Sequence, residues 1–243
     1  MIKKNIPNAI TSLNLLCGCI GIVYAFTDLT VSSYMIFLAC VFDFLDGFVA
    51  RLLKVSSPIG KELDSLADVV TFGVLPSIIV YNLFSLDSIN ELVNKLIQDP
   101  VYTFLPYVSF AIAIFSAVRL AIFNLDTRQS DSFLGLPTPA NALFFASFPL
   151  IISQYPDSEI RSFLLSPYLL TGVSLFMSYM LVSGIALFAL KFKSFGWKAN
   201  KVKYIFLVSA ALLFVALNVL SIPIIIFLYI ILSFAERKIK VSS

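Results

Sequence analysis

Long runs of hydrophobic residues separated by short polar segments dominate the pattern along the chain. A membrane-spanning helix needs about 20 mainly apolar residues to cross about 30 Å of hydrocarbon. Candidate spans lie at residues 9–27, 32–53, 62–84, 101–124, 138–155, 166–190, 204–219 and 222–235. The pattern therefore predicts an all-α integral membrane protein with about eight transmembrane helices.

The last two candidate spans follow each other so closely that they resemble a single run. One helix from Lys203 to Glu236 would be about 50 Å long at 1.5 Å per residue, which is too long for one crossing. Asn218, Ser221 and Pro223 are residues that favour a break between the two halves. We therefore expect two short crossings.

The distribution of charge predicts the orientation of these helices. Eight crossings with a cytoplasmic N-terminus place every Lys and Arg except Lys95 and Arg161 on the inner side. The outer loops then carry mainly acidic residues, namely Asp28, Asp87, Glu91, Asp99, Asp157 and Glu159. This asymmetry follows the positive-inside rule and predicts that both termini are cytoplasmic. The basic loop from Lys191 to Lys203 either sets this topology or attracts anionic lipids.

Composition excludes several classes of protein. Hydrophobic residues make up 59% of the 243-residue chain and charged residues only 13%, whereas soluble domains average about 45–50% and about 25%. A water-soluble globule is therefore excluded. A net charge of +3 in such an apolar chain gives no indication of a nucleic-acid partner. Because the chain has no histidine, proton transfer near neutral pH must use carboxylates, Lys, Tyr or water.

Four aspartates interrupt the second and third apolar runs, where an acid costs several kcal/mol at bilayer depth. Asp43 and Asp46 are three residues apart, and Asp64 and Asp68 are four apart, so each pair shares one face of its helix. The short connection between the runs contains Pro58, which suits an antiparallel helix pair. We expect the four carboxylates to converge at the cytoplasmic end of that pair.

A converging group of carboxylates implies bound cations, because the unpaired charges would repel one another. Oxygen ligands without His or Cys select Mg²⁺, Mn²⁺ or Ca²⁺. Four carboxylates suit a site with two ions about 3.5–4 Å apart, which promotes displacement at phosphorus. The alternatives are a structural ion-pair cluster with Arg51, Lys54 and Lys61, and a divalent-cation transporter that uses the same acids.

The acids belong to a longer pattern, D-x2-D-G-x2-A-R-x8-G-x3-D-x3-D, which runs from Asp43 to Asp68. It resembles the signature of the CDP-alcohol phosphatidyltransferase family at every fixed position. The resemblance implies a magnesium- or manganese-dependent integral membrane enzyme, usually a homodimer, that cleaves a CDP-linked lipid. It also implies a six-helix core, here residues 1–191. Residues 192–243 would add the basic loop, a C-terminal helical hairpin and a cytoplasmic tail to the same membrane domain.

The resemblance also implies roles for individual residues. Asp43, Asp46 and Asp64 correspond to metal ligands, and Asp68 to the general base, which also touches a metal. The CDP-binding residues would be Asn8, Thr11, Asp46, Gly47, Ala50, Arg51 and Gly60. For Thr11, an ordinary polar position on the first helix is an equally good interpretation.

Two further segments bear on the alcohol that accepts the phosphatidyl group. Residues 116–124 (SAVRLAIFN) and 133–141 (FLGLPTPAN) resemble segments of phosphatidylserine synthases of the integral-membrane type II. Ile122 stands where those relatives often carry Arg. The candidate acceptor- or phosphate-binding residues are Arg119, Asn124, Pro137 and Thr138. Alternatively, Arg119 is an interfacial anchor and Pro137 only begins a helix.

The sequence therefore predicts an enzyme that transfers the phosphatidyl group from CDP-diacylglycerol to L-serine and releases phosphatidylserine and CMP. The expected mechanism is direct displacement at phosphorus, assisted by two Mg²⁺ or Mn²⁺ ions. The same chemistry with glycerol 3-phosphate and the cation transporter remain as alternatives. We expect a homodimer among the lipids of a bacterial inner membrane, with the active site on the cytoplasmic side.

Overall fold

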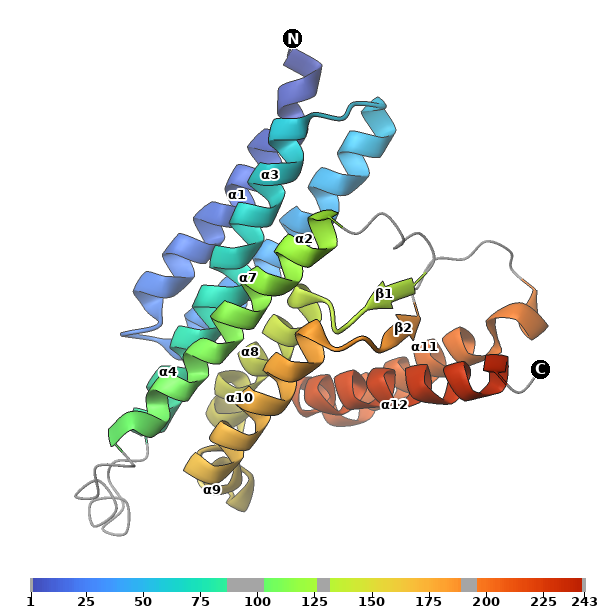
Figure 1. Cartoon of the computed structure of the whole chain (residues 1–243). Coiled ribbons are helices and arrows are strands. Elements are labelled where there is room, and N and C mark those ends of the chain that lie inside the picture. Colours follow the sequence, from blue (N-terminus) through green and yellow to red (C-terminus); the bar gives the residue numbers. More distant parts are fainter. Residues whose placement is uncertain (1, 87–102, 126–131, 189–195, 242–243) are drawn as a thin grey trace.

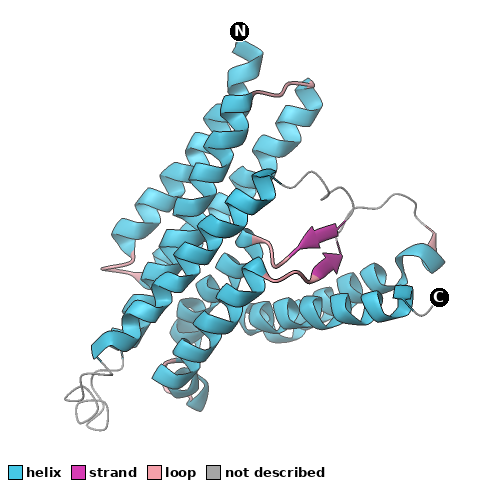
Figure 2. Ribbon diagram, viewed as in Figure 1, coloured by secondary structure: helices cyan, strands magenta, loops and turns pink. Residues whose placement is uncertain are grey.

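The computed structural model describes residues 2–86, 103–125, 132–188 and 196–241, and Figure 1 shows their arrangement. Figure 2 shows that these residues are almost entirely helical, which confirms the all-α class. The helices are α1 (Ile2–Tyr24), α2 (Leu29–Leu53), α3 (Pro58–Asp68), α4 (Leu75–Leu86), α7 (Phe110–Leu125), α8 (Thr138–Gln154), α9 (Glu159–Leu164), α10 (Pro167–Val182), α11 (Trp197–Leu217) and α12 (Ser221–Val241). The 3-10 turn Leu105–Ser109 precedes α7, and the π-helical segment Val69–Val74 joins α3 to α4.

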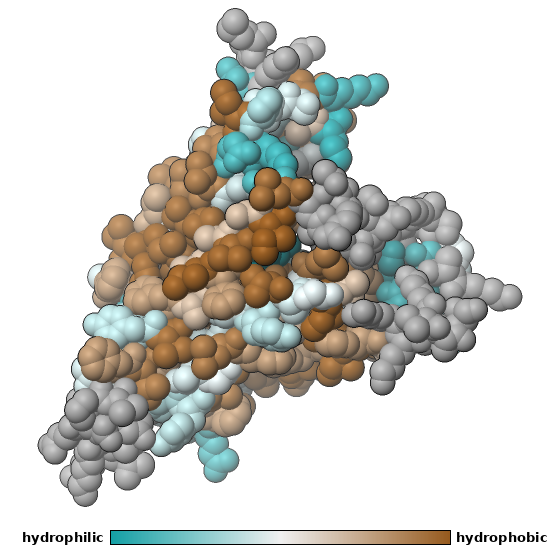
Figure 3. Space-filling model, viewed as in Figure 1, coloured by the Kyte–Doolittle hydropathy of each residue, from teal (hydrophilic) through white to brown (hydrophobic). Residues whose placement is uncertain are grey.

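Four helical stretches of the described chain are long and apolar enough to cross a membrane: Asn5–Tyr24, Pro58–Leu86, Leu105–Leu125 and Asn200–Glu236. Pro167–Val182 is a shorter apolar helix. In Figure 3 hydrophobic side chains cover most of the visible face along the long helices, and hydrophilic ones gather at the end where α1 begins. Apolar side chains on the outside of a helical bundle suit a lipid environment, so the chain is a membrane protein.

Helix α1 is the element on which the acid-bearing segments assemble, because both α2 and α3 pack against it. Small residues on α1 allow this close approach. A Cβ atom at Gly18 would collide with Thr71 of the π-helical segment, and one at Gly21 would meet Leu75 at 2.5 Å. Small residues at helix contacts are typical of membrane bundles, where apolar burial alone drives little association.

The turn between α2 and α3 has clear local causes. Helix α2 ends at Lys54, whose φ of 52° lies in the left-handed region that commonly terminates helices. Ser57 then caps α3 by accepting a hydrogen bond from the Gly60 amide. Pro58 occupies the first turn of α3, where its missing N–H costs nothing. The short connection predicted at Pro58 is confirmed.

Two short strands form a feature that the hydrophobic pattern did not indicate. Strand β1 (Ser132–Leu134) pairs antiparallel with β2 (Ala186–Phe188), and Phe133 lies opposite Leu187. The span expected at 166–190 was therefore wrong at its C-terminal end, because α10 stops at Val182 and the chain continues as β2. The turn after β1 is tied to the end of α10, since the amides of Gly135 and Leu136 donate to the carbonyls of Ile185 and Met180.

Gly135 is a position where only glycine fits. Its φ is +76°, and a Cβ atom there would collide with the Leu181 carbonyl oxygen. We expect Gly135→Ala to lower the free energy of unfolding by about 1–3 kcal/mol. The measurement is thermal unfolding in detergent, with Gly184→Ala as the control because no atom of the described residues lies within 4 Å of a Cβ atom at that position. Equal melting temperatures for the two variants would contradict this account of the turn.

The C-terminal hairpin has the break that the sequence predicts. Asn218 has φ 50° and ψ −129°, and the 3-10 turn Asn218–Leu220 separates α11 from α12. The two helices pack side by side, and in Figure 1 they run across the direction of α1, α4 and α7. Two helices rather than one long helix are confirmed for 197–241. Of the basic segments that flank the hairpin, residues 191–195 lie outside the described residues.

Candidate active site

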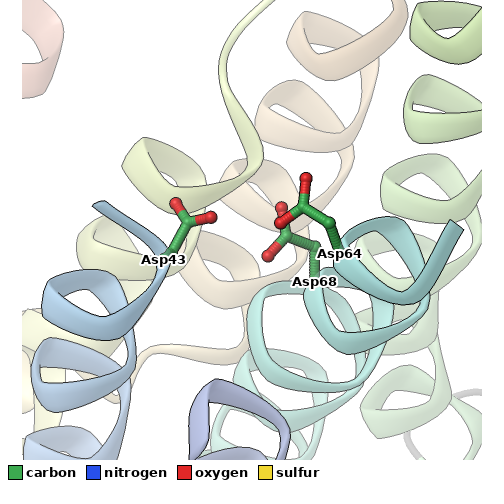
Figure 4. A group of neighbouring side chains, drawn as sticks. All are labelled: Asp43, Asp64 and Asp68. Carbon is green, nitrogen blue, oxygen red and sulfur yellow. The ribbon is translucent and has the colours of Figure 1, made fainter. Parts of the chain in front are cut away.

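Three of the four predicted aspartates meet between α2 and α3. Figure 4 shows Asp43 on α2 facing Asp64 and Asp68 on α3. Each of the three offers a carboxylate oxygen, and these atoms all lie within 4.8 Å of one another. One oxygen of Asp64, Oδ1, is buried and accepts no hydrogen bond from the described residues. A cluster of carboxylates with an oxygen that accepts no hydrogen bond is stabilised by a bound cation.

The fourth predicted ligand, Asp46, lies beside this group rather than within it. Its carboxylate accepts a hydrogen bond of 2.6 Å from the Thr11 hydroxyl of α1. Asp46 is nevertheless three residues from Asp43 on α2, so the two carboxylates lie on the same face of that helix. Asp46 therefore connects the acidic group with α1.

Asn14 on α1 orients the carboxylate of Asp68. Its side-chain amide donates to Asp68 Oδ1 at 3.1 Å, and both residues are buried. The backbone carbonyl of Asn14 accepts from the Thr71 hydroxyl, which fixes this turn of α1 against the π-helical segment. π-Helical turns are frequent at functional sites, and this one begins directly after Asp68.

A cavity of about 280 Å³ adjoins the acids and extends to the α2–α3 turn, whose residues form part of its lining. It is lined by Pro7, Asn8, Thr11, Asp46, Gly47, Ala50, Val55, Ser56, Ser57, Gly60, Lys61 and Asp64. Six of the seven residues predicted to bind CDP are in this lining. The seventh, Arg51, lies at its edge, because the Arg51 guanidinium is 3.5 Å from the place where a Gly47 Cβ atom would be.

The glycines of the signature keep this cavity open. A Cβ atom at Gly60 would approach the Asn8 side-chain oxygen to 2.8 Å. Gly60 and Asn8 therefore form a tight contact between α3 and α1, and a side chain at Gly60 would displace Asn8. A ligand that lies flat against Gly47 and Ala50 is consistent with the small residues on that wall.

Two of the four predicted acceptor-site residues meet in the fold. Arg119 of α7 is 8% exposed and donates from Nη1 to the Thr138 hydroxyl at 3.3 Å. Its Nε is buried and has no hydrogen-bond partner in the described chain. The guanidinium carbon lies 5.6 Å from the centre of the Phe123 ring. A buried guanidinium with an unused donor is suited to an anion.

The other two predicted acceptor-site residues have different surroundings. Asn124 connects the end of α7 to α3. Its side-chain amide donates to the Ser65 hydroxyl, and its backbone carbonyl accepts from the Lys61 ammonium. Pro137 caps α8 and lines a separate apolar cavity. Among the described residues, the Asn124 side chain bonds to α3 rather than to Arg119, and Pro137 is joined to Arg119 through its neighbour Thr138.

Sequence reasoning missed Asn14 and the contributions of the α2–α3 turn. Asn14 is three residues after Thr11 and lies inside an apolar run, so its polarity was a usable signal. Val55, Ser56 and Ser57 of the turn and Lys61 of α3 line the cavity, but nothing in their spacing distinguishes them from an ordinary connection.

The acidic group fits a divalent metal ion. Its donors are all carboxylate oxygens, which hard cations prefer, and one buried oxygen lacks a partner. Family members generally depend on a divalent metal, in agreement with this donor set.

Comparisons with known proteins place this geometry in a family. The family model described as CDP-alcohol phosphatidyltransferase matches residues 4–183. A CDP-diacylglycerol–serine O-phosphatidyltransferase of Helicobacter pylori is 36% identical over 180 residues, which are 69% of this chain and 67% of the relative.

Proteins of the same name are similar in Methanocaldococcus jannaschii and Bacillus subtilis. The first is 33% identical over 69% of this chain and 72% of the relative. The second is 32% identical over 74% of this chain and 88% of the relative. The matched residues contain the acidic group, the adjoining cavity and Arg119, and the chain belongs to the CDP-alcohol phosphatidyltransferase family.

Proposed function

We propose that the protein transfers the phosphatidyl group from CDP-diacylglycerol to L-serine, forming phosphatidylserine and CMP. The observation that carries this proposal is the partly buried group of Asp43, Asp64 and Asp68 beside a cavity lined by the residues of the signature. The names of the similar proteins supply serine as the acceptor.

The cavity would hold the nucleotide end of the lipid substrate. Gly47 and Ala50 allow the CDP group to lie close to the backbone of α2, and Asn8 and Thr11 offer polar atoms from α1. Arg51 at the edge of the cavity can form paired hydrogen bonds with a phosphate. The acyl chains would remain in the bilayer beside the bundle.

Asp43, Asp46, Asp64 and Asp68 would hold the metal, for which we propose two Mg²⁺ or Mn²⁺ ions. Bound there, the ions would neutralise the charge of the pyrophosphate and of the departing CMP. Asp46 can serve as a ligand and keep its hydrogen bond from Thr11, because an ionised carboxylate has about four acceptor sites on its two oxygens.

Asp68 would act as the general base. It accepts the proton of the serine hydroxyl while the serine oxygen bonds to phosphorus and the bond from phosphorus to the CMP oxygen breaks. The Asn14 amide holds one carboxylate oxygen of Asp68, which leaves the other to face the substrate. A base held in one orientation keeps its proton-accepting oxygen in place during the reaction.

Arg119 would bind the carboxylate of serine. Thr138 fixes one arm of its guanidinium, and the unpaired Nε can donate to an anionic acceptor. A carboxylate and a guanidinium match in shape and charge, so this contact would favour an amino acid over a neutral alcohol.

We also propose that residues 1–191 form the catalytic core and that 192–243 extend it. The protein would be a homodimer in the bacterial inner membrane. Its active site would lie at the cytoplasmic face of that membrane. The orientation rests on the distribution of Lys and Arg along the chain.

The decisive experiment measures CMP release from CDP-diacylglycerol by the purified protein in detergent micelles with Mg²⁺ or Mn²⁺. We expect release to depend on L-serine and to be far slower with glycerol 3-phosphate or inositol phosphate. Faster release with glycerol 3-phosphate would overturn serine as the acceptor. No release with any alcohol, together with metal uptake into vesicles, would favour a cation transporter instead.

A further inference from the structure

The C-terminal hairpin lies beyond the residues that the family model matches, yet it reaches the acceptor end of the site. Its contact is made by Tyr229 of α12. The Tyr229 hydroxyl donates to the Phe188 backbone carbonyl at 2.9 Å, where strand β2 ends. This is a bond between two segments that are 41 residues apart.

Aromatic packing fixes the ring of Tyr229 in this place. The ring centre lies 4.9 Å from that of Phe188 in an edge-to-face arrangement and 5.6 Å from that of Phe206 on α11. Such pairs stabilise one orientation of the rings as well as burying them. The hydroxyl position is therefore set by α11 and β2 together.

From Tyr229 a short path leads to Arg119. Tyr229 and Pro137 line the same apolar cavity of about 270 Å³, and Pro137 directly precedes Thr138, the partner of Arg119. Arg119 is therefore connected to the hairpin through Thr138, Pro137 and this cavity.

The hydrogen bond from the Tyr229 hydroxyl to the Phe188 carbonyl and the ring packing fix the hairpin side of the cavity that Pro137 also lines. Because Thr138 follows Pro137 and accepts a hydrogen bond from Arg119, the position of this segment influences the orientation of the guanidinium. We propose that Tyr229 is a positioning residue, through which the hairpin orients Arg119 toward the carboxylate of the acceptor. This inference rests on the proposed function and adds to it a role for the C-terminal hairpin.

The test is Tyr229→Phe, which removes only the hydroxyl and keeps the ring packing. We expect the KM for L-serine to rise about 2- to 10-fold, the change that corresponds to the loss of one hydrogen bond. The KM for CDP-diacylglycerol and the kcat should stay within about twofold, because the nucleotide cavity and Asp68 are untouched. Tyr179→Phe is the matched control, since Tyr179 of α10 is 61% exposed.

A double-mutant comparison separates positioning from a general loss of structure. If Tyr229 acts through Arg119, Tyr229→Phe added to Arg119→Lys should raise the serine KM no further than Arg119→Lys alone. Fully additive effects, or an unchanged serine KM in Tyr229→Phe, would overturn the role of Tyr229 and leave the proposed function intact. A wild-type protein without serine-dependent CMP release would instead overturn the proposed function.

Discussion

Asp43→Ala is expected to abolish serine-dependent CMP release, with kcat/KM lower by about 10³-fold or more. Asp43 is the contribution of α2 to the three carboxylates that lie within 4.8 Å of one another. A metal that bridges the two helices would lose its anchor on one side. Losing several kcal/mol of charge stabilisation in the transition state corresponds to a change of this size.

The thermal stability of Asp43→Ala shows whether the variant has lost only a metal-binding side chain or has lost its fold. The three carboxylates repel one another when no cation is bound, so removing one should leave the melting temperature of the metal-free protein equal or higher. Added Mg²⁺ or Mn²⁺ should raise the melting temperature of the wild type more than that of Asp43→Ala. These measurements are thermal unfolding in detergent with and without the metal.

Asp28→Asn provides the control for a changed acid outside the site. Asp28 caps α2 at the opposite end by accepting from the amides of Thr30 and Val31, and asparagine caps helices equally well. We expect wild-type rates and wild-type metal dependence for this variant. Normal turnover by Asp43→Ala would show that the acidic group is structural rather than catalytic.

Local helical spacing predicted the pairs of acids, and the resemblance to the family signature predicted the residues that line the cavity. Asp64 and Asp68 share a face of α3 in any helix, and so do Asp43 and Asp46 on α2. The short connection at Pro58 predicted that the two faces would meet, but it did not predict that α1 holds them in place. The Thr11 and Asn14 side chains reach Asp46 and Asp68 over 35 and 54 residues, and pairings of that range leave no periodic signal.

The part of the site that would bind the acceptor was harder to predict, because short strands and turns rather than regular helices form it. Hydropathy continues past Val182, so the pattern extended the sixth span through residues that form β2. The pairing of β1 with β2 depends on Gly135 and on tertiary contacts with α10, which a hydropathy pattern does not record. The same irregular segment brings Phe188 to Tyr229, so the proposed role of the hairpin was invisible in the sequence.

Asp68→Asn is expected to lower kcat by about 10²- to 10⁴-fold, the range that general-base assistance supplies. The substitution keeps the size of the side chain, and its amide oxygen can still accept the hydrogen bond from Asn14. An amide cannot take the serine proton, so the loss should appear in kcat while the KM for CDP-diacylglycerol changes little.

Metal titration distinguishes a base from a ligand at this position. If Asp68 served only as a metal ligand, a high concentration of Mg²⁺ or Mn²⁺ would restore the rate of Asp68→Asn, and general-base action would be contradicted. If Asp68 takes the proton, the rate should stay low at saturating metal. Asp64→Asn gives the matched comparison, because Asp64 belongs to the same group of three carboxylates but is not proposed as the base. Its rate should recover at least in part as the metal concentration rises, and the difference between these two neighbours on α3 assigns the proton transfer.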